Sequence, residues 1–257
     1  MLTALLLGIV PAQGAGLALA LAVDVSASVS AESYLLQRNG IARAFENPRL
    51  VGAIAAVPGG IEALILEWSD PDRIAVTVGW RRISDSESAA AFAAAARATQ
   101  RSSRGLTAIG PALLAAASQF DDLPEPAERR IIDISGDGMA NFGIAPQLAR
   151  DRVVAAGISI NALAILTEEQ WLEGYYRANV IGGPAAFVAP VHGAGSFGNA
   201  ILRKLVQEVA GASLSATSSS HPEHPETCRF YRRIEARRNS QCQGQPGVGR
   251  VDDAVVP

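Results

Sequence analysis

The sequence has very little lysine and cysteine and no excess of positive charge. Its only lysine is Lys204, and its only cysteines are Cys228 and Cys242, close to the C-terminus of the 257-residue chain. Two cysteines so placed provide no disulfide framework for the rest of the chain, although an exported protein could join this one pair. The net charge of -3 and the pI near 5.7 give no electrostatic attraction to nucleic acid.

The sequence gives no support for a nucleophilic triad. His192 is the only histidine in the first 212 residues, and neither a Gly-x-Ser-x-Gly turn nor a cysteine accompanies it. His221, His224, Cys228 and Cys242 follow no common zinc-ligand spacing. A disulfide in this tail, or no bond at all, is the simpler interpretation.

One segment matches the residue pattern of a dinucleotide-binding motif but not its structural context. Residues 193–198 read Gly-x-Gly-x-x-Gly and stand between a predicted strand and a predicted helix. They open the last such unit, so no strand follows to present the acidic residue that would bind a ribose. We interpret this segment as a turn.

The first charged residue is Asp24, so residues 1–23 form one long uncharged stretch. Its length would allow a single membrane-spanning helix, which needs about 20 apolar residues, but a proline and several glycines interrupt it. The pattern favours an export signal over residues 1–15, with an apolar core at 2–10 and small residues at 12–14. We therefore expect a periplasmic or secreted protein with no membrane span after cleavage of the signal.

Between residues 16 and 212, hydrophobic periodicity predicts one domain of alternating strands and helices. Strands are predicted at 17–25, 61–68, 73–80, 130–135, 158–166 and 186–191, and helices at 30–45, 86–99, 107–120, 146–156, 168–178 and 197–210. Only residues 69–72 separate the second strand from the third, too few for a parallel crossover, so these two should form an antiparallel hairpin. The fold class is therefore α/β: a doubly wound, mostly parallel six-stranded sheet with one antiparallel edge strand and helices on both faces.

The composition changes after Gly211. Residues 213–257 are rich in Ser, Pro, Arg, Gln and Gly and show little periodicity. This composition predicts a low-complexity, disordered tail.

Polar residues stand where ligands of such sheets bind, at the carboxyl ends of the strands. Asp24-Val25-Ser26-Ala27-Ser28 follows the first strand, Gly105-Leu106-Thr107 precedes a helix, and Ser135-Gly136-Asp137-Gly138 ends the fourth strand. An Asp-x-Ser-x-Ser turn can direct one carboxylate and two hydroxyls at a single point. Thr107 adds a third hydroxyl, and Asp137 adds a second carboxylate.

The predicted metal ligands are Asp24, Ser26, Ser28, Thr107 and Asp137. All of them offer oxygen, which suits Mg²⁺, Mn²⁺ or Ca²⁺ rather than zinc. Five protein positions around an octahedral ion leave at least one for water or for a carboxylate of a partner. The alternative is that Asp24 and Ser26 merely cap a loop, as such residues often do.

Together these segments resemble the von Willebrand A-like family and its metal-ion-dependent adhesion site, or MIDAS. The family's Asp-x-Ser-x-Ser is matched at residues 24–28, its threonine before a helix at Thr107, and its Asp-Gly at residues 137–138. The resemblance covers about residues 17 to 211. Gly136 departs from the usual Thr/Ser-Asp-Gly order and could change how closely Asp137 approaches the metal.

Three further stretches are similar to a bacterial exported group of these domains that has no assigned biochemical role: residues 67–69, 134–138 and 180–184. In the family, the two serines and the threonine contact the metal, and the aspartates often act through water. The resemblance also implies a partner protein whose Asp or Glu completes the coordination shell.

Two other polar residues have two interpretations each. Asp133 lies inside the apolar strand at 131–134, where an unpaired carboxylate is costly. It either orients the metal loop or accepts hydrogen bonds from the backbone. Asn141 either supports the same loop or only forms a turn.

The function predicted from these residues is a divalent-cation-dependent protein-binding module in the bacterial envelope, without enzymatic activity. One alternative is a metal-dependent, phosphatase-like hydrolase, since phosphotransfer sites on similar sheets also begin with an Asp after the first strand. Those enzymes place a second Asp two residues later, where this chain has Ser26, and no general base is evident. The other alternative is a structural envelope protein with a vestigial metal site.

Overall fold

A computed structural model describes residues 14–166, 170–193 and 196–211. Nearly all of the predicted signal segment, the whole tail at 213–257 and both cysteines lie outside the described residues. These expectations therefore stay predictions. Among the described residues, no helix has the length and apolar character needed to cross a membrane.

Six strands form a single sheet in the order β3-β2-β1-β4-β5-β6. Their bounds are Ala15–Asp24 (β1), Ile61–Trp68 (β2), Ala75–Ile83 (β3), Ala127–Gly136 (β4), Ser159–Ile165 (β5) and Val188–Val191 (β6). Every neighbouring pair is parallel except β2 and β3, which form the antiparallel hairpin, so β3 is the antiparallel edge strand. The predicted fold class is confirmed.

The apolar strand β1 lies inside the sheet because nothing in it is suited to solvent. All ten of its residues are buried, as expected for a parallel strand covered on both faces. It pairs with β2 on one side and with β4 on the other, in a register that sets Asp24 opposite Trp68 and Val23 opposite Ser135. The carboxyl ends of three strands therefore meet at one edge of the sheet.

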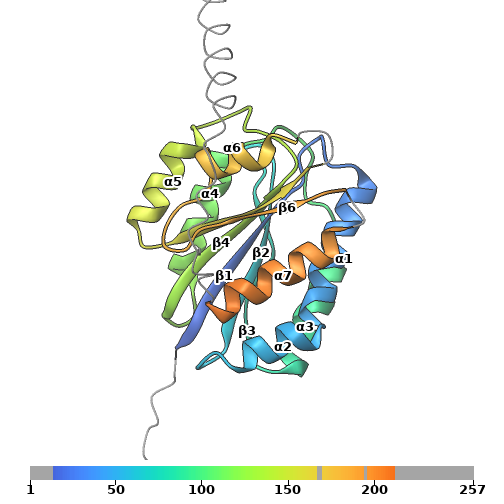
Figure 1. Cartoon of the computed structure of the whole chain (residues 1–257), viewed down its shortest axis with the longest axis vertical. Coiled ribbons are helices and arrows are strands. Elements are labelled where there is room, and N and C mark those ends of the chain that lie inside the picture. Colours follow the sequence, from blue (N-terminus) through green and yellow to red (C-terminus); the bar gives the residue numbers. More distant parts are fainter. Residues whose placement is uncertain (1–13, 167–169, 194–195, 212–257) are drawn as a thin grey trace, which may run out of the picture. The chain divides into compact units, whose positions relative to one another are not determined.

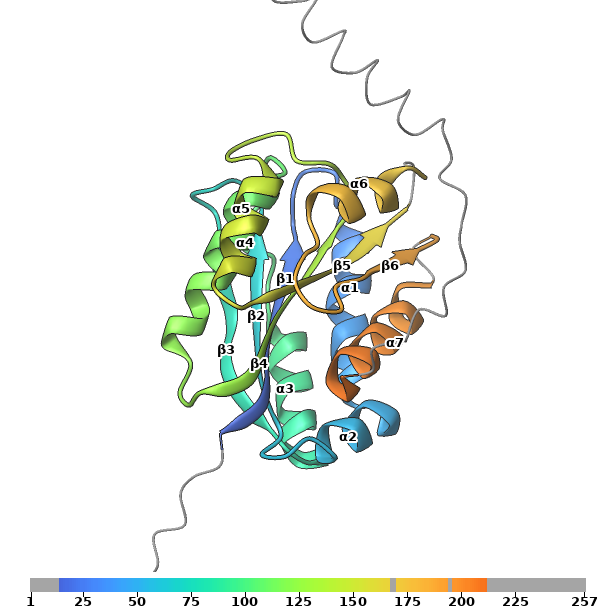
Figure 2. The same cartoon turned by 60° about the vertical axis from the view of Figure 1, so that its left-hand side comes forward.

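Helices cover both faces of the sheet, as Figures 1 and 2 show. Their bounds are Ala31–Phe45 (α1), Pro48–Ala55 (α2), Ser86–Ala98 (α3), Ile109–Ser118 (α4), Pro146–Ala155 (α5), Leu172–Asn179 (α6) and Phe197–Ala210 (α7), with a 3₁₀ turn at Gln119–Asp122. Because side chains alternate along a strand, Leu19 and Leu21 of β1 join the core with α1, α2, α3 and α7. Ala20 and Ala22 join the core with α4, α5 and α6.

The structure adds one helix to those predicted and corrects the start of two others. Helix α2 was not predicted; it begins at Pro48 after Asn47, whose side chain accepts a hydrogen bond from the backbone of Arg49. Helix α4 begins at Ile109 rather than at Thr107. Helix α6 begins at Leu172 rather than at residue 168, and residues 167–169 lie outside the described part.

The Gly-x-Gly-x-x-Gly stretch connects β6 to α7, and residues 194–195 within it are not described. Within residues 14–211, no strand follows α7. The context that a dinucleotide site would need is therefore missing from this part of the chain.

Neither predicted role describes Asp133. Its carboxylate oxygen Oδ1 lies 2.6 Å from Nζ of Lys204 on α7, and both side chains are buried. The same ammonium lies 2.5 Å from Oε1 of Glu208, one turn further along α7. Asp133 thus anchors α7 to the sheet and takes no part in the loop at the strand ends, because its side chain points to the α7 face.

The second carboxyl of this buried cluster, that of Glu208, has a raised pKa. Burial, followed by the charge of Asp133, raises the pKa of Glu208 to about 8. Asn161 on β5 satisfies Oε1 of Glu208 with a hydrogen bond of 2.8 Å.

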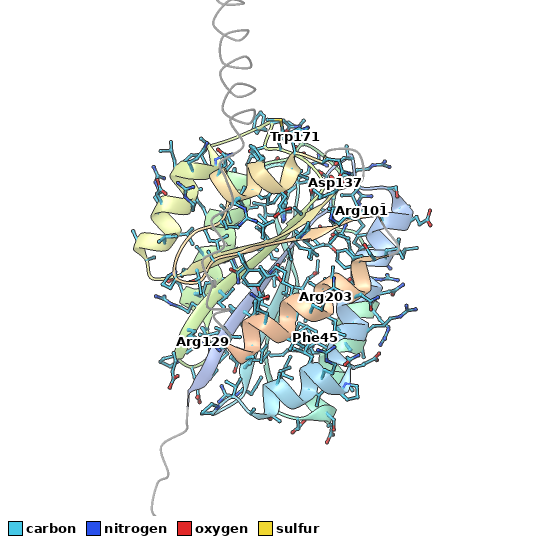
Figure 3. All side chains as sticks on the ribbon, in the orientation of Figure 1. Phe45, Arg101, Arg129, Asp137, Trp171 and Arg203 are labelled. Atoms are coloured by element: carbon cyan, nitrogen blue, oxygen red, sulfur yellow. The ribbon has the colours of Figure 1, made fainter. Side chains whose placement is uncertain are left out.

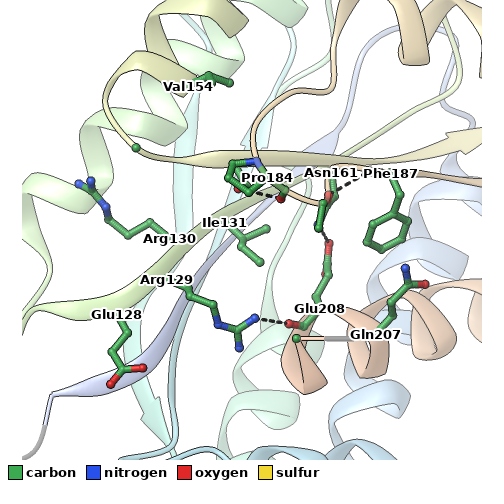
Figure 4. A pocket seen from close by; sticks show the side chains of 14 residues that line it. Glu128, Arg129, Arg130, Ile131, Val154, Asn161, Pro184, Phe187, Gln207 and Glu208 are labelled. Carbon is green, nitrogen blue, oxygen red and sulfur yellow. Dashed lines mark hydrogen bonds between the residues drawn. The ribbon is translucent and has the colours of Figure 1, made fainter. Parts of the chain in front are cut away.

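A hollow of about 490 Å³ lies beside this cluster, between the starts of β4 and β5 and the end of α7 (Figure 4). Its wall includes Arg129, whose guanidinium donates to the backbone carbonyls of Glu208 and Val209. The arginine thereby satisfies carbonyls that the end of a helix leaves without partners.

We expect Lys204→Met to destabilise the domain by about 3–5 kcal/mol, because it leaves Asp133 and Glu208 buried without their cation. Urea unfolding followed by circular dichroism measures this change. The variant Asp133→Asn/Lys204→Met removes both members of the pair and should recover most of the loss. Equal destabilisation of the single and double variants would contradict an ion-pair origin.

Candidate functional site

The turn after β1 brings its polar side chains together by local hydrogen bonds. The backbone N–H of Ser26 donates to Oδ1 of Asp24 at 2.7 Å, and the hydroxyls of Ser26 and Ser28 lie 3.1 Å apart. Asp24 and Ser26 are fully buried, whereas Ser28 is exposed. The turn therefore runs from a buried carboxylate to a hydroxyl at the surface.

Asp137 reaches the same turn from the end of β4. The hydroxyl of Ser28 donates to Oδ1 of Asp137 at 2.6 Å. The glycine before it permits this approach: a Cβ at Gly136 would lie 2.3 Å from the hydroxyl of Tyr176 and 3.1 Å from Oδ2 of Asp24. The absence of a side chain at Gly136 thus leaves room for Asp24 and Tyr176. It does not prevent Asp137 from reaching the hydroxyl of Ser28.

Thr107 comes to this edge of the sheet in the segment that precedes α4. The carbonyl of Gly105 accepts a hydrogen bond of 2.7 Å from the N–H of Ala27, which joins the segment to the Asp24 turn. A Cβ at Gly138 would lie 4.0 Å from the hydroxyl of Thr107. All five predicted ligands are therefore found on three adjoining loops; that they bind a cation stays a prediction.

Asn141 supports Thr107. Its side-chain carbonyl accepts from the N–H of Thr107 at 2.9 Å, and its own N–H donates to the carbonyl of Thr107 at 3.0 Å. Because these bonds engage the backbone of Thr107, α4 begins two residues later. Of the two interpretations of Asn141, support of the loop describes what the structure contains.

The carboxyl of Asp24 lies in surroundings that disfavour its charge. Burial, followed by the nearby charge of Asp137, raises the pKa of Asp24 to about 7, although hydrogen bonds from Ser26 partly oppose this shift. Its second oxygen, Oδ2, is buried and has no hydrogen-bond partner. Such an orphaned acceptor is costly unless a proton or a cation satisfies it.

The turn is clamped from outside by Arg101, which sequence reasoning missed. Its guanidinium donates to the backbone carbonyls of Val25 and Ser26, each at 2.7 Å, and to that of Val29 at 2.9 Å. A single arginine thus holds three carbonyls of the loop that carries Asp24, Ser26 and Ser28. In the sequence, Arg101 lies among other polar residues more than 70 positions away, with no local pattern to identify it.

Glu67, on β2, fixes the segment that contains Arg101. One carboxylate oxygen accepts from the hydroxyl of Tyr34 at 2.9 Å and the other from the N–H of Ser102 at 2.7 Å. In the sequence, Glu67 is notable only because residues 67–69 resemble those of related bacterial domains. Its contacts show that it links α1 to the loop before α4.

Two tyrosines of α6 hold the loop after β4. The hydroxyl of Tyr176 donates to the carbonyl of Gly138 at 3.2 Å, and the hydroxyl of Tyr175 accepts from the N–H of Ala140 at 3.1 Å. Burial and the charge of Asp24 raise the pKa of Tyr176 well above its usual value. Tyr176 therefore remains a neutral donor in this position.

The arrangement fits a divalent cation. Two carboxyls that repel each other, three hydroxyls and an unpartnered buried oxygen are features that a hard cation relieves. The described residues contain no group of three or more His, Cys, Asp or Glu side chains suited to a metal. A cation here would therefore depend on the hydroxyls, because only two carboxylates are present.

The fold is similar to that of several solved structures. Proximal thread matrix protein 1 from the mussel byssus, solved with a zinc-occupied MIDAS motif, has a TM-score of 0.58 and 14% identity, with 77% of this chain and 48% of that chain covered. The pilus adhesin SpaC from Lactobacillus rhamnosus GG, in an open conformation, has a TM-score of 0.55 and 12% identity, with coverages of 76% and 30%.

A von Willebrand factor type A protein from Catenulispora acidiphila has a TM-score of 0.50 and 16% identity, with 76% of this chain and 42% of that chain covered. The chain thus spans about half the length of the mussel protein and less of the other two. At these identities the likeness shows the fold, which is the von Willebrand A-like fold that the motifs predicted.

In sequence, residues 15–213 match the model of the family described as "Protein of unknown function (DUF1194)". No curated protein matches the chain.

Cation binding should weaken as the pH falls. Because the pKa of Asp24 lies at about 7 in the cation-free protein, a cation that needs the carboxylate must displace a proton below that pH. Titration calorimetry with Mg²⁺ should show an affinity about tenfold lower at pH 6 than at pH 8. An affinity that does not change over this range would contradict the assignment.

The same pKa predicts how the stability of the cation-free protein depends on pH. The folded state binds the Asp24 proton more tightly than the unfolded state, whose carboxyl has a pKa near 3.8. Stability should therefore fall as the pH rises from 4 to 7. Asp24→Asn should remove the part of this dependence that Asp24 causes and leave the part caused by Glu208, whose pKa is also raised. Thermal melts of both proteins at several pH values would measure the difference.

Arg101→Gln should lower the affinity for the cation about tenfold, the usual range for a residue that orients metal ligands. The substitution removes hydrogen bonds to three backbone carbonyls of the turn and leaves the side chain of every predicted ligand unchanged. Arg104→Gln, at an exposed neighbouring position, is the matched control and should bind as the wild type does. Equal affinities for all three proteins would show that the clamp does not position the ligands.

Proposed function

The chain belongs to the family described as "Protein of unknown function (DUF1194)", and we propose that it is a divalent-cation-dependent protein-binding module of the bacterial envelope. In this proposal Asp24, Ser26, Ser28, Thr107 and Asp137 hold the ion. An Asp or Glu of a partner protein occupies the side of the ion that the chain leaves open.

One observation carries the proposal. Asp24 is fully buried at the end of the central strand, and its Oδ2 has no hydrogen-bond partner although Ser26, Ser28 and Asp137 surround the same turn. A loop that needed Asp24 only as a cap would use a single carboxylate. It would not bring a second one close enough to raise its pKa.

The three hydroxyls and two carboxylates differ in burial and would approach the ion from different sides. Ser26 and Thr107 are buried and would approach the ion from within the fold, whereas Ser28 and Asp137 lie toward solvent. A bound ion would supply a localised positive charge for a partner carboxylate. This contact is strong only where the surrounding surface excludes water.

The oxygen donors favour Mg²⁺, Mn²⁺ or Ca²⁺. The mussel protein of similar fold has been solved with zinc in its MIDAS motif, so zinc belongs among the ions to be tested. The pilus adhesin of similar fold is consistent with a binding role. At 12–14% identity, neither carries its ion or partner over to this chain.

We further propose that the module is not an enzyme and that it is exported by the predicted signal at residues 1–15. Ser26 stands where a phosphatase of similar sheet would place its second Asp. The metal-dependent hydrolase remains the second candidate, because Asp24 follows the first strand as the nucleophile of such enzymes does. A structural protein with a vestigial site is the third.

The test compares the full chain with Asp24→Ala and with Asp121→Ala, a matched change at an exposed aspartate. Titration calorimetry with Mg²⁺, Mn²⁺ and Zn²⁺ should detect binding to the wild type and to Asp121→Ala, and none to Asp24→Ala. Circular dichroism should show all three proteins folded. A wild type that binds none of these ions would favour the vestigial site.

A phosphatase assay with Mg²⁺ separates the module from the hydrolase. We expect no turnover, because the candidate site lacks a general base. Turnover that Asp24→Ala abolishes and Asp121→Ala preserves would overturn the proposal of a binding module.

A further inference from the structure

Four large apolar side chains lie exposed near the candidate cation site, three on loops that carry predicted ligands and one just before α6. Leu106 is 44% exposed, Met139 44%, Phe142 52% and Trp171 38%. Leu106 directly precedes Thr107, Met139 and Phe142 follow Asp137 in the loop after β4, and Trp171 directly precedes α6. We call these four residues the apolar rim.

Backbone contacts hold the first part of the rim in place. The paired hydrogen bonds between Thr107 and Asn141 join the segment that carries Leu106 to the loop that carries Phe142. A Cβ at Gly143 would also lie 2.6 Å from the ring of Pro111 on α4. The two apolar side chains therefore project from loops that are fixed to each other.

The second part of the rim is tied to the same loop through Tyr175. Its hydroxyl accepts from the N–H of Ala140, which follows Met139. Its ring packs edge-on against Trp171, with the ring centroids 6.3 Å apart. In Figure 3, Trp171, Asp137 and Arg101 lie toward the same end of the sheet.

Single exposed apolar residues are common on protein surfaces and need no explanation. Four of them on connected loops beside one polar site, however, are typical of a protein interaction surface. The described part of the chain has seven exposed large hydrophobic side chains, and four of them form the rim. Each would be better covered than left in water.

The charges around the rim favour an acidic partner. A divalent ion would balance the carboxylates of Asp24 and Asp137. Asp70, which accepts from the N–H of Leu106 at 2.7 Å, is paired with Arg73 at 3.6 Å. Arg101 and Arg104 lie close to each other beside the turn, where Glu67 accepts from the N–H of Ser102. Arg104 is exposed, so its guanidinium is the positive charge of this segment that a partner can reach.

We propose that the apolar rim and the candidate cation site together bind a protein segment in which an Asp or Glu is flanked by large aliphatic or aromatic side chains. This inference rests on the proposed function and adds the chemistry of the partner. The flanking side chains would cover Leu106, Phe142, Met139 and Trp171, while the acid reaches the ion between them.

The two halves of such a contact strengthen each other. Apolar contacts around a polar centre exclude water, so the carboxylate meets the ion in surroundings of lower dielectric constant. Without the apolar neighbours, a lone carboxylate would compete with water for an exposed ion. The rim therefore supplies selectivity among the many acidic side chains that a cation alone could bind.

The probe is a random peptide library displayed on phage and selected on the immobilised full chain in Mg²⁺, with elution by chelator. We expect the enriched peptides to combine an acidic residue with large apolar neighbours. One of them, synthesised with a fluorescent label, then reports affinity by anisotropy. Phe142→Ser and Trp171→Ser should each weaken it about tenfold, and both should bind Mg²⁺ as the wild type does.

Val76→Ser is the matched control, because Val76 is 43% exposed but lies on the edge strand β3 and not on the loops. It should bind the peptide normally. Three results would overturn the inference: no enrichment at all, enriched peptides without apolar neighbours, or unchanged affinity of both rim variants. If the chain still binds Mg²⁺ in these cases, the proposed function stands. A wild type that does not bind Mg²⁺ in calorimetry would instead defeat the proposed function itself.

Discussion

The burial of one carboxylate at the end of the central strand organises the rest of the site. Asp24 can be buried there because β1 is apolar throughout and ends at the edge where β2 and β4 also end. Once buried, the carboxylate must be satisfied, since an orphaned acceptor in a protein interior is costly. Ser26 satisfies one oxygen. The other is left for a proton or for a cation.

The surrounding chain holds the turn more firmly than a capped loop requires. Arg101 clamps its carbonyls, Gly136 leaves the space that Asp24 and Tyr176 occupy, and Asn141 orients Thr107. These contacts come from residues far from Asp24 in the sequence. Such support places oxygen atoms at fixed positions before any ligand arrives, which lowers the cost of ordering them on binding. The apolar rim extends the same fixed surface outward.

The sequence predicts the strands and the clustered ligands of this structure better than it predicts short helices and long-range contacts. The strands and the antiparallel hairpin follow from hydrophobic runs and a short connection, which are local signals. The five clustered ligands follow from the rule that polar residues after parallel strands share one edge. Helix α2 was missed because it is short and its cap was not recognised. The partners of Asp133 and Arg101 lie about 70 residues away, and no local pattern indicates contacts of that range.

The central claim is that these oxygen atoms enclose a divalent cation. Crystals of the chain soaked in MnCl₂ and measured for anomalous scattering test it most directly. The account predicts an anomalous peak enclosed by the side chains of Asp24, Ser26, Ser28, Thr107 and Asp137. A map with no peak there, at a concentration that places manganese elsewhere on the protein, would contradict it.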